Sequence, residues 1–225
     1  FIKSAVQLRE TVAVRHGLMV VGETCAGKTR LINTLRRAFG KLAKTVPEQG
    51  FDSVRPITIS PKSITMAQLY GKKDANTMEW VDGVLAIKFR MSSNDESGER
   101  FWITFDGPVD AVWIESMNTV LDDNKKLCLA SGEIIKMNPL TTMMFETDNL
   151  REASPATVSR VGMVFMEPKR MGWRPVFQSW LDTGLPRSLA AVPARVQQVK
   201  DLFEWLAPPL LHFVANNVNV LCPVT

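Results

Sequence analysis

The amino-acid sequence predicts an α/β fold in which a parallel sheet is flanked by helices and followed by part of a helical lid. The first observation is segment 16–39, where a short apolar strand, a glycine-rich loop and an amphipathic helix follow one another. The second is the alternation of strand-like and helical patterns as far as about residue 170, which is typical of a parallel sheet covered on both faces. The third is the purely helical pattern beyond that point. The predicted domains are therefore 1–170, an α/β subdomain, and 171–225, the incomplete start of a helical lid.

Composition narrows the class of protein. The 225 residues are 45% hydrophobic and 22% charged, which is ordinary for a globular domain. No apolar run approaches the roughly 18 residues of a membrane span, and the first ten residues lack the apolar core of a signal peptide. The chain does not begin with Met, which suggests an excerpt from a longer protein. We therefore expect neither a membrane segment nor a secretory signal.

Charge and cysteine usage give two further expectations. The net charge is +4 with both signs interleaved, and the densest basic patch, 35–44, has the spacing of a solvated helix face. Because a basic stripe with aromatic platforms is missing, nucleic acid is not expected as a partner. Cys25, Cys128 and Cys222 have no metal-like spacing and the two histidines lie far apart, so we expect a reduced, intracellular protein without a zinc site.

The amino-terminal elements are predicted from apolar spacing. Helical spacing covers 4–15, and the pair His16-Gly17 is a plausible helix stop. Residues 18–21 form a β-type run. After the glycine-rich loop a helix is predicted as far as about Gly40, from apolar side chains at Leu31, Ile32, Leu35 and Phe39.

Three patterns precede the second buried strand. Residues 55–61 alternate like a strand, 63–71 resemble a short helix closed by Gly71, and 80–93 favour a helix. The polar stretch 92–100 is predicted to be an exposed loop.

The carboxyl-terminal half of the α/β subdomain is predicted to continue the alternation. A buried strand over 101–105 precedes a helix over 113–124, and 125–137 resembles a hairpin about the Ser131-Gly132 turn. Two more buried strands are predicted over 140–148 and 161–168.

A short helix is predicted between those last two strands. Ser154 is placed as its N-cap, Pro155 as its first residue and Arg160 at its end. Beyond residue 170 the lid is predicted to be helical, with an interruption at Pro208-Pro209.

The glycine-rich loop is the strongest local signal for a ligand. It fits G-x-x-x-x-G-K-[ST] between a strand and a helix, the context that identifies a phosphate-binding P-loop, and consists of Gly22, Glu23, Thr24, Cys25, Ala26, Gly27, Lys28 and Thr29. Its glycines let backbone N–H groups approach phosphate oxygens, and the following helix directs its positive end at the anion. Lys28 is predicted to contact the β and γ phosphates, Thr29 to bind Mg²⁺, and Cys25 to be a neutral filler. The expected cofactors are ATP or ADP with Mg²⁺.

Asp106 is the predicted second half of that site. It ends the buried strand 101–105, and its carboxylate is expected to hold Mg²⁺ through water while Thr29 binds the ion directly. The next position, where a nucleotide hydrolase usually carries a glutamate base, is Gly107. Loss of such a base typically costs ~10²–10⁴-fold in rate, so the site is expected to hold its nucleotide.

Other acids are candidates to replace the missing glutamate base. Glu115 lies on the following predicted helix and Asp110 is closer to the strand end, although either is also an ordinary surface or capping acid. Glu146 and Asp148 end the next strand, where a polar residue that senses the γ-phosphate is expected, and Asn149 is adjacent.

Long stretches resemble the second AAA+ module of dynein heavy chains. The matching segments are 105–137, 153–168, 14–29 and 61–71, the last with an axonemal character. The resemblance implies the AAA+ form of the P-loop fold over 1–170, within a ring of six modules that moves along microtubules. The second module of that family binds ATP, is not expected to hydrolyse it, and receives its own partner arginine from the third module.

The resemblance also implies a role for Arg160 and a cellular setting. Arg160 matches the family's arginine finger, which reaches into the ATP site of the first module. The implied partners are the neighbouring modules, microtubules, and dynein intermediate and light chains. The implied location is the cytoplasm and cytoskeleton, in the axoneme of a cilium or flagellum.

The sequence therefore leaves three alternative functions. The first is a module filled with ATP that stiffens the ring and lends Arg160 to its neighbour. The second is an independently hydrolysing ATPase that uses Glu115 or Asp110. The third, a small-molecule kinase, lacks an evident acceptor pocket and fits Arg160 poorly.

Overall fold

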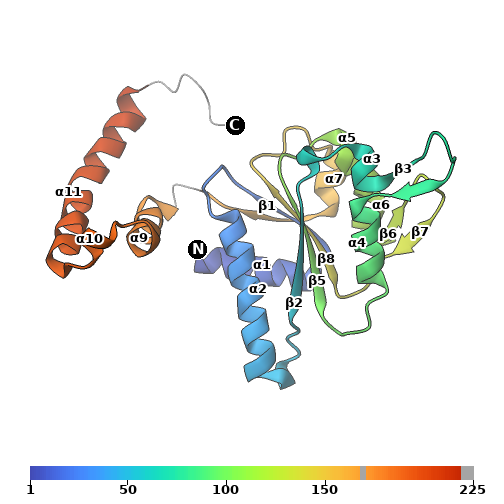
Figure 1. Cartoon of the computed structure of the whole chain (residues 1–225), viewed down its shortest axis with the longest axis horizontal. Coiled ribbons are helices and arrows are strands. Elements are labelled where there is room, and N and C mark those ends of the chain that lie inside the picture. The colour runs from blue at the N-terminus through green and yellow to red at the C-terminus, as the bar shows by residue number, and fades with distance from the viewer. Residues whose placement is uncertain (168–170, 219–225) are drawn as a thin grey trace. The chain divides into compact units, whose positions relative to one another are not determined.

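Five parallel strands form the central sheet of the computed structural model, which describes residues 1–167 and 171–218 (Figure 1). The strands stand in the order β2-β5-β8-β1-β9 and all of their pairings are parallel. They are β1 (Gly17–Val21), β2 (Val54–Ile59), β5 (Arg100–Asp106), β8 (Thr141–Thr147) and β9 (Gly162–Phe165). Because the strands are parallel, all of their carboxyl ends lie along one edge of the sheet.

Both faces of the sheet are covered by helices, as its apolar pattern requires. Alternate residues of β1 point to opposite faces: Leu18 and Val20 join one buried cluster, whereas Met19 and Val21 join the other. The first face carries α1 (Ile2–Val14) and α2 (Lys28–Thr45) (Figure 1). The second carries α3 (Met66–Tyr70), α4 (Val84–Ser93), α5 (Ala111–Ile114) and α6 (Asn118–Leu121).

Two hairpins and one short helix complete this part. Strand β3 (Gly71–Lys73) pairs with β4 (Trp80–Asp82), and β6 (Lys126–Cys128) pairs with β7 (Ile134–Lys136), both antiparallel. The second hairpin confirms the turn predicted at Ser131-Gly132. Helix α7 (Pro155–Arg160) begins as predicted, because the side chain of Ser154 accepts a hydrogen bond from Thr157 N. Short 3₁₀ turns occupy 47–49, 61–63 and 115–117.

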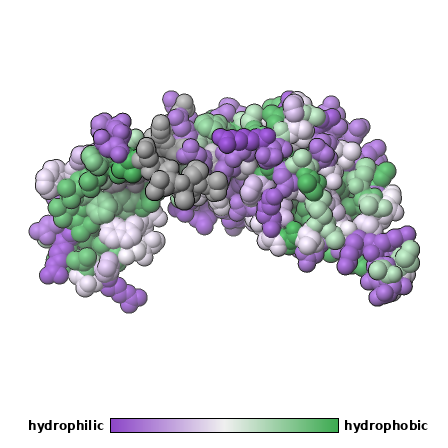
Figure 2. Space-filling model, turned by 90° about the horizontal axis from the view of Figure 1, so that it is seen from above, coloured by the Kyte–Doolittle hydropathy of each residue, from purple (hydrophilic) through white to green (hydrophobic). Residues whose placement is uncertain are grey.

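A second compact unit, residues 169–225, follows the first, which spans 1–168. Its described helices are α9 (Arg174–Thr183), α10 (Arg187–Ala190) and α11 (Pro193–Asn217). Stacked rings of Phe177 and Phe203, 4.2 Å apart, join α9 to α11, and Arg174 forms an ion pair with Glu204. Apolar side chains nevertheless gather on the surface of this unit (Figure 2).

The structure corrects three helix boundaries. Helix α2 passes through Gly40 and ends before Pro47, since a glycine costs only about 1 kcal/mol inside a helix whereas a proline disfavours helical geometry in the residue before it. Segment 80–93 is split into β4 and α4 at Gly83. A Cβ atom there would lie 2.3 Å from Leu69 O. Segment 113–124 is divided into α5, a 3₁₀ turn and α6.

The predicted interruption at Pro208-Pro209 is wrong. Both prolines lie inside helix α11, which is continuous although neither proline has a backbone N–H group to donate. Among the described residues no helix is long and apolar enough to cross a bilayer. Pro168 at the end of the predicted last strand, the predicted boundary at residue 170, and Cys222 lie outside the described residues.

Candidate nucleotide site

The predicted phosphate loop connects the carboxyl end of β1 to the amino terminus of α2. Gly22 is required by close packing, because a Cβ atom there would lie 2.2 Å from Met166 O. Cys25 and Gly27 have φ angles of 66° and 84°, so the backbone curls around the space in front of the helix. Such a curl turns successive N–H groups inward, and the positive end of the 18-residue helix α2 adds to the same field. This backbone conformation suits an anionic ligand.

The ammonium group of Lys28 stands over the loop. Its Nζ donates hydrogen bonds to Gly22 O and to Glu23 O, the latter at 3.2 Å, and forms an ion pair with Asp148 Oδ1 at 2.7 Å. Asp148 also accepts a bond of 3.5 Å from the hydroxyl of Thr24. Asp148 therefore competes with any phosphate for the lysine, a contact absent from the predicted set.

Thr29 is tied to Glu146, the acidic residue in β8. The hydroxyl donates to Glu146 Oε2 at 2.5 Å, and Glu146 is only 3% exposed. Burial is the chief cause that raises the pKa of Glu146, and the charge of Asp106 adds to it, whereas the Thr29 bond and the charge of Lys28 oppose it. Asp106 and Glu146 are register partners of neighbouring strands, so two carboxylates and one hydroxyl meet at the carboxyl edge of the sheet.

These groups line one cavity of about 340 Å³. Its walls combine the loop with the ends of β5 and β8, and consist of Thr24, Cys25, Ala26, Gly27, Lys28, Thr29, Asp106, Gly107, Pro108, Glu146, Thr147 and Asp148. All of the predicted loop residues from Thr24 to Thr29 and the predicted Asp106 thus come together.

The oxygen donors in the cavity fit Mg²⁺. Thr29, Asp106 and Glu146 offer hard oxygen ligands, which this ion prefers. The described residues contain no cluster of three or more His, Cys, Asp or Glu side chains suited to a metal ion. Mg²⁺ at nucleotide sites is commonly held by one or two carboxylates and completed by phosphate and water.

The position of the missing base has an unusual backbone. Gly107 has a φ of +149°, a region that favours glycine, and its N–H donates to Glu146 O at 3.1 Å. A glutamate here would therefore be strained. Neither of the two acids considered as replacements for the missing base lines the cavity. Asp110 is paired with Lys62 and caps α5. Glu115 is exposed.

The contact of Glu146 with Thr29 was not predicted from the sequence. Glu146 was visible as one charged residue in the otherwise apolar and hydroxylic run of strand β8. A charge is buried in such a strand only when it has a partner, so this pattern was the available signal. Its closeness to Thr29 depends on strand order, which the sequence did not supply.

Arg160 lies away from the cavity. It ends α7 two residues before Gly162, the register partner of Leu18 near the start of β1, so it sits at the amino edge of the sheet. The phosphate loop follows the opposite end of β1. The guanidinium pairs with Asp122 and donates to Ala156 O at 2.7 Å, while the side chain stays 31% exposed.

The sequence of this chain is similar to those of known proteins. The family model described as AAA domain (dynein-related subfamily) matches residues 17–161. The chain is 51% identical over 213 residues to Dynein axonemal heavy chain 3 of Homo sapiens, covering 95% of this chain and 5% of the relative. It is 46% identical over 216 residues to Dynein axonemal heavy chain 12 of Mus musculus, covering 95% and 7%. It is 44% identical over 223 residues to Dynein axonemal heavy chain 6 of Homo sapiens, covering 99% and 5%. The chain thus spans a small fraction of the length of these relatives.

Proposed function

The chain belongs to the dynein-related subfamily of AAA domains, and from that premise we propose that it is the second AAA+ module of an axonemal dynein heavy chain. In this role it holds ATP with little or no hydrolysis and lends Arg160 to the neighbouring hydrolytic site. Residues 1–170 are its nucleotide-binding subdomain, and 171–225 begin its helical lid.

The observation that carries the proposal is the backbone at Gly107. The base that polarises the attacking water usually projects from the residue after such an aspartate, and there the φ of +149° disfavours any side chain. The rest of the cavity keeps what binding needs: the curled loop, Lys28 and Thr29. That combination supports retention of ATP without hydrolysis.

The residues divide the task of holding ATP. The loop N–H groups and the Lys28 ammonium bind phosphate oxygens, and Lys28 exchanges its ion pair with Asp148 for them. Thr29, Asp106 and Glu146 are the oxygen groups that would hold Mg²⁺, which when bound neutralises phosphate charge. Glu146 keeps the Thr29 hydroxyl oriented through their hydrogen bond.

Arg160 is proposed to serve another module, because its place at the amino edge of the sheet separates it from this cavity. A planar guanidinium on a short helix end suits γ-phosphate oxygens across an interface. An arginine supplied in this way can raise a rate by about 10³–10⁵. The pair with Asp122 is broken or shared when that contact forms.

Partners and location follow from the same proposal. The partners are neighbouring AAA+ modules of one heavy chain, microtubules through the whole motor, and dynein intermediate and light chains. The location is the cytoskeleton of the axoneme in a cilium or flagellum, which agrees with the axonemal names of the relatives.

A direct test is the chemical identity of the nucleotide retained after purification. The chain is loaded with ATP and Mg²⁺, desalted, denatured, and its nucleotide is separated by chromatography at increasing times. ATP that persists over hours supports holding. Conversion to ADP at the rate of a motor cycle would reject it.

A second candidate, an independently hydrolysing module, is favoured by one observation. The buried Glu146 lies beside Thr29 and Asp106, and its pKa is raised, as suits a general base at neutral pH. In this candidate function the general base is Glu146, in place of Glu115 or Asp110. If ADP accumulates, Glu146→Gln should stop its formation while Glu115→Gln should not.

A further inference from the structure

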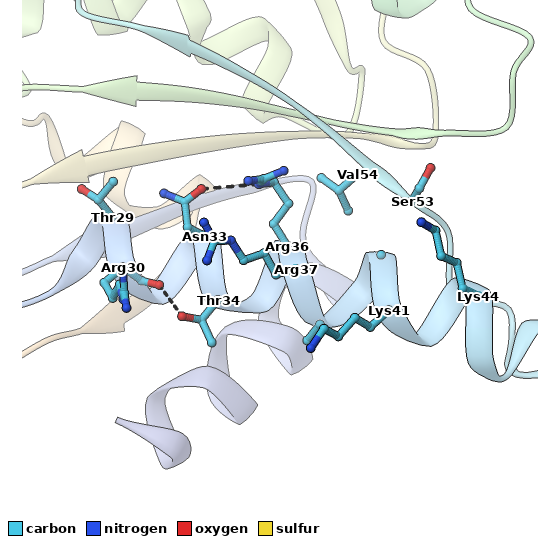
Figure 3. A pocket seen from close by; sticks show the side chains of 12 residues that line it. Thr29, Arg30, Asn33, Thr34, Arg36, Arg37, Lys41, Lys44, Ser53 and Val54 are labelled. Atoms are coloured by element: carbon cyan, nitrogen blue, oxygen red, sulfur yellow. Dashed lines mark hydrogen bonds between the residues drawn. The ribbon is translucent and has the colours of Figure 1, made fainter. Parts of the chain in front are cut away.

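A second cavity is a basic groove that shares only Thr29 with the nucleotide cavity. It has a volume of about 1080 Å³ and runs along α2 beside the start of β2, an edge strand of the sheet (Figure 3). Five of its twelve lining residues are cationic and none is acidic: Arg30, Arg36, Arg37, Lys41 and Lys44. We call this surface the α2 groove.

The cations of the α2 groove are ordered along one side of the helix. Arg30, Arg37, Lys41 and Lys44 are separated by seven, four and three positions, so they share one face. At 1.5 Å per residue they cover about 21 Å, with successive spacings of about 10.5, 6 and 4.5 Å. An extended peptide rises about 3.3–3.4 Å per residue, so about six residues span the same length. The row therefore matches a short extended segment in length.

These charges are also unpaired. Within residues 1–167 and 171–218, no carboxylate lies within 4.0 Å of any of the five, although Arg55, Lys62, Arg90 and Arg100 all have carboxylate partners. Arg36 is oriented by a weak bond of 3.4 Å from its Nε to Asn33 Oδ1 (Figure 3). Five like charges in one groove repel one another, and a polyanion removes that repulsion.

The lining selects the kind of polyanion. No aromatic side chain lines the groove, so bases have no stacking platform. Ala38 and Val54 are its few apolar members, too few for an inserted lipid chain. Flexible lysines and forked arginines along an open trough suit a row of carboxylates.

We propose that the α2 groove binds an acidic polypeptide segment of about six residues in extended conformation. The sequence predicts a solvated helix face over 35–44. The structure adds that this face lines a groove, and that its cations form a row without carboxylate partners. The proposal does not rest on the phosphate contacts of Lys28, because Lys28 does not line the groove and only Thr29 is shared by the two cavities.

The test measures binding of a fluorescein-labelled hepta-glutamate peptide to the 225-residue chain by anisotropy at low and physiological salt. The groove variant is Arg37→Glu/Lys41→Glu. The matched control is Lys72→Glu/Lys73→Glu, which changes the net charge equally on the exposed β3 hairpin. We expect the groove variant to weaken binding about tenfold or more and the control less than about threefold, with affinity falling as salt rises.

Several outcomes would overturn the proposal. They are no peptide binding at low salt, an equal loss in both variants, or a single-stranded oligonucleotide of the same charge that displaces the peptide and binds more tightly. Thermal unfolding of each variant shows whether it folds. If the charge reversals do not fold, Arg37→Gln/Lys41→Gln and Lys72→Gln/Lys73→Gln give the same comparison. Lys28→Ala should leave peptide affinity unchanged, which separates this result from failure of the nucleotide site.

Discussion

The hydroxyl of Thr29 donates a hydrogen bond of 2.5 Å to Oε2 of Glu146, and so links the phosphate loop to the middle of the sheet. Glu146 is buried and stands in register with Asp106. The three side chains come from α2, β8 and β5, which meet only because the strands are parallel and share a carboxyl edge. The loop and the carboxyl edge of the sheet therefore form one site.

Lys28→Ala should weaken retention of ATP. The ammonium supplies a charge-assisted contact worth about 1.5–3 kcal/mol, so the Kd should rise roughly ten- to hundredfold. Nucleotide content after desalting measures the effect. Lys62→Ala is the matched control, since it also removes a Lys–Asp pair but lies outside the cavity. Stoichiometric ATP in the Lys28 variant would reject the phosphate loop assignment.

Gly107→Glu should destabilise the fold without producing an ATPase. The φ of +149° makes a side chain there cost about 1–3 kcal/mol. Gly107→Ala has the same backbone cost and no carboxylate, so the two variants should unfold at similar denaturant concentrations. Rapid turnover in the glutamate variant alone would show that the backbone adapts and that only the missing acid prevents hydrolysis.

Glu146→Gln should raise the Mg²⁺ concentration needed for ATP retention. The substitution keeps the shape but removes one of the three carboxylates that line the cavity, and divalent cations bind anionic oxygens more tightly. The electron paramagnetic resonance spectrum of bound Mn²⁺ provides a readout that does not depend on turnover. Glu115→Gln, outside the cavity, should change neither measurement. Identical metal affinity in all three proteins would remove Glu146 from the metal site.

Arg160→Lys should impair the whole motor almost as much as Arg160→Ala. Lysine keeps the charge but loses the planar fork that matches phosphate oxygens. The measurement is microtubule-stimulated ATPase of the complete heavy chain, together with ATP content at the Lys28 site. ATP content should stay unchanged in both variants. A normal motor rate with ATP lost from this module would reverse the direction assigned to Arg160.

His16 should make stability depend on pH. Burial is the chief cause that lowers the pKa of His16 below its ordinary 6.5, and the charge of Lys125 lowers it further, against the hydrogen bonds to Val120 O and Leu121 O and the charge of Asp123. The folded protein thus prefers neutral His16, so this stability is present above pH 6.5 and is lost as the pH falls through the lowered pKa. The Tm should drop more between pH 7 and 5 than that of His16→Gln. Parallel curves would contradict the assignment.

Local patterns predicted several elements correctly. The order of strand, loop and helix around Gly22–Thr29 depends on neighbouring residues, and the Ser154 cap acts within one turn of α7. The hairpin at Ser131-Gly132 likewise needs only adjacent segments. Errors arose where a local signal was overridden: α2 continues through Gly40, and α11 continues through Pro208 and Pro209.

The sequence by itself determined the phosphate loop, the acid that ends β5 and the absence of an acid after it, because each is a residue type at a fixed place along the chain. Only the tertiary structure decided that Glu146 joins Thr29, 117 positions away, and that Asp148 pairs with Lys28. It also decided that Asp110 and Glu115 stay outside the cavity and that Arg160 lies at the opposite edge of the sheet. Strand order and register set those distances, and they result from burying both faces of the sheet at once, which no single segment encodes.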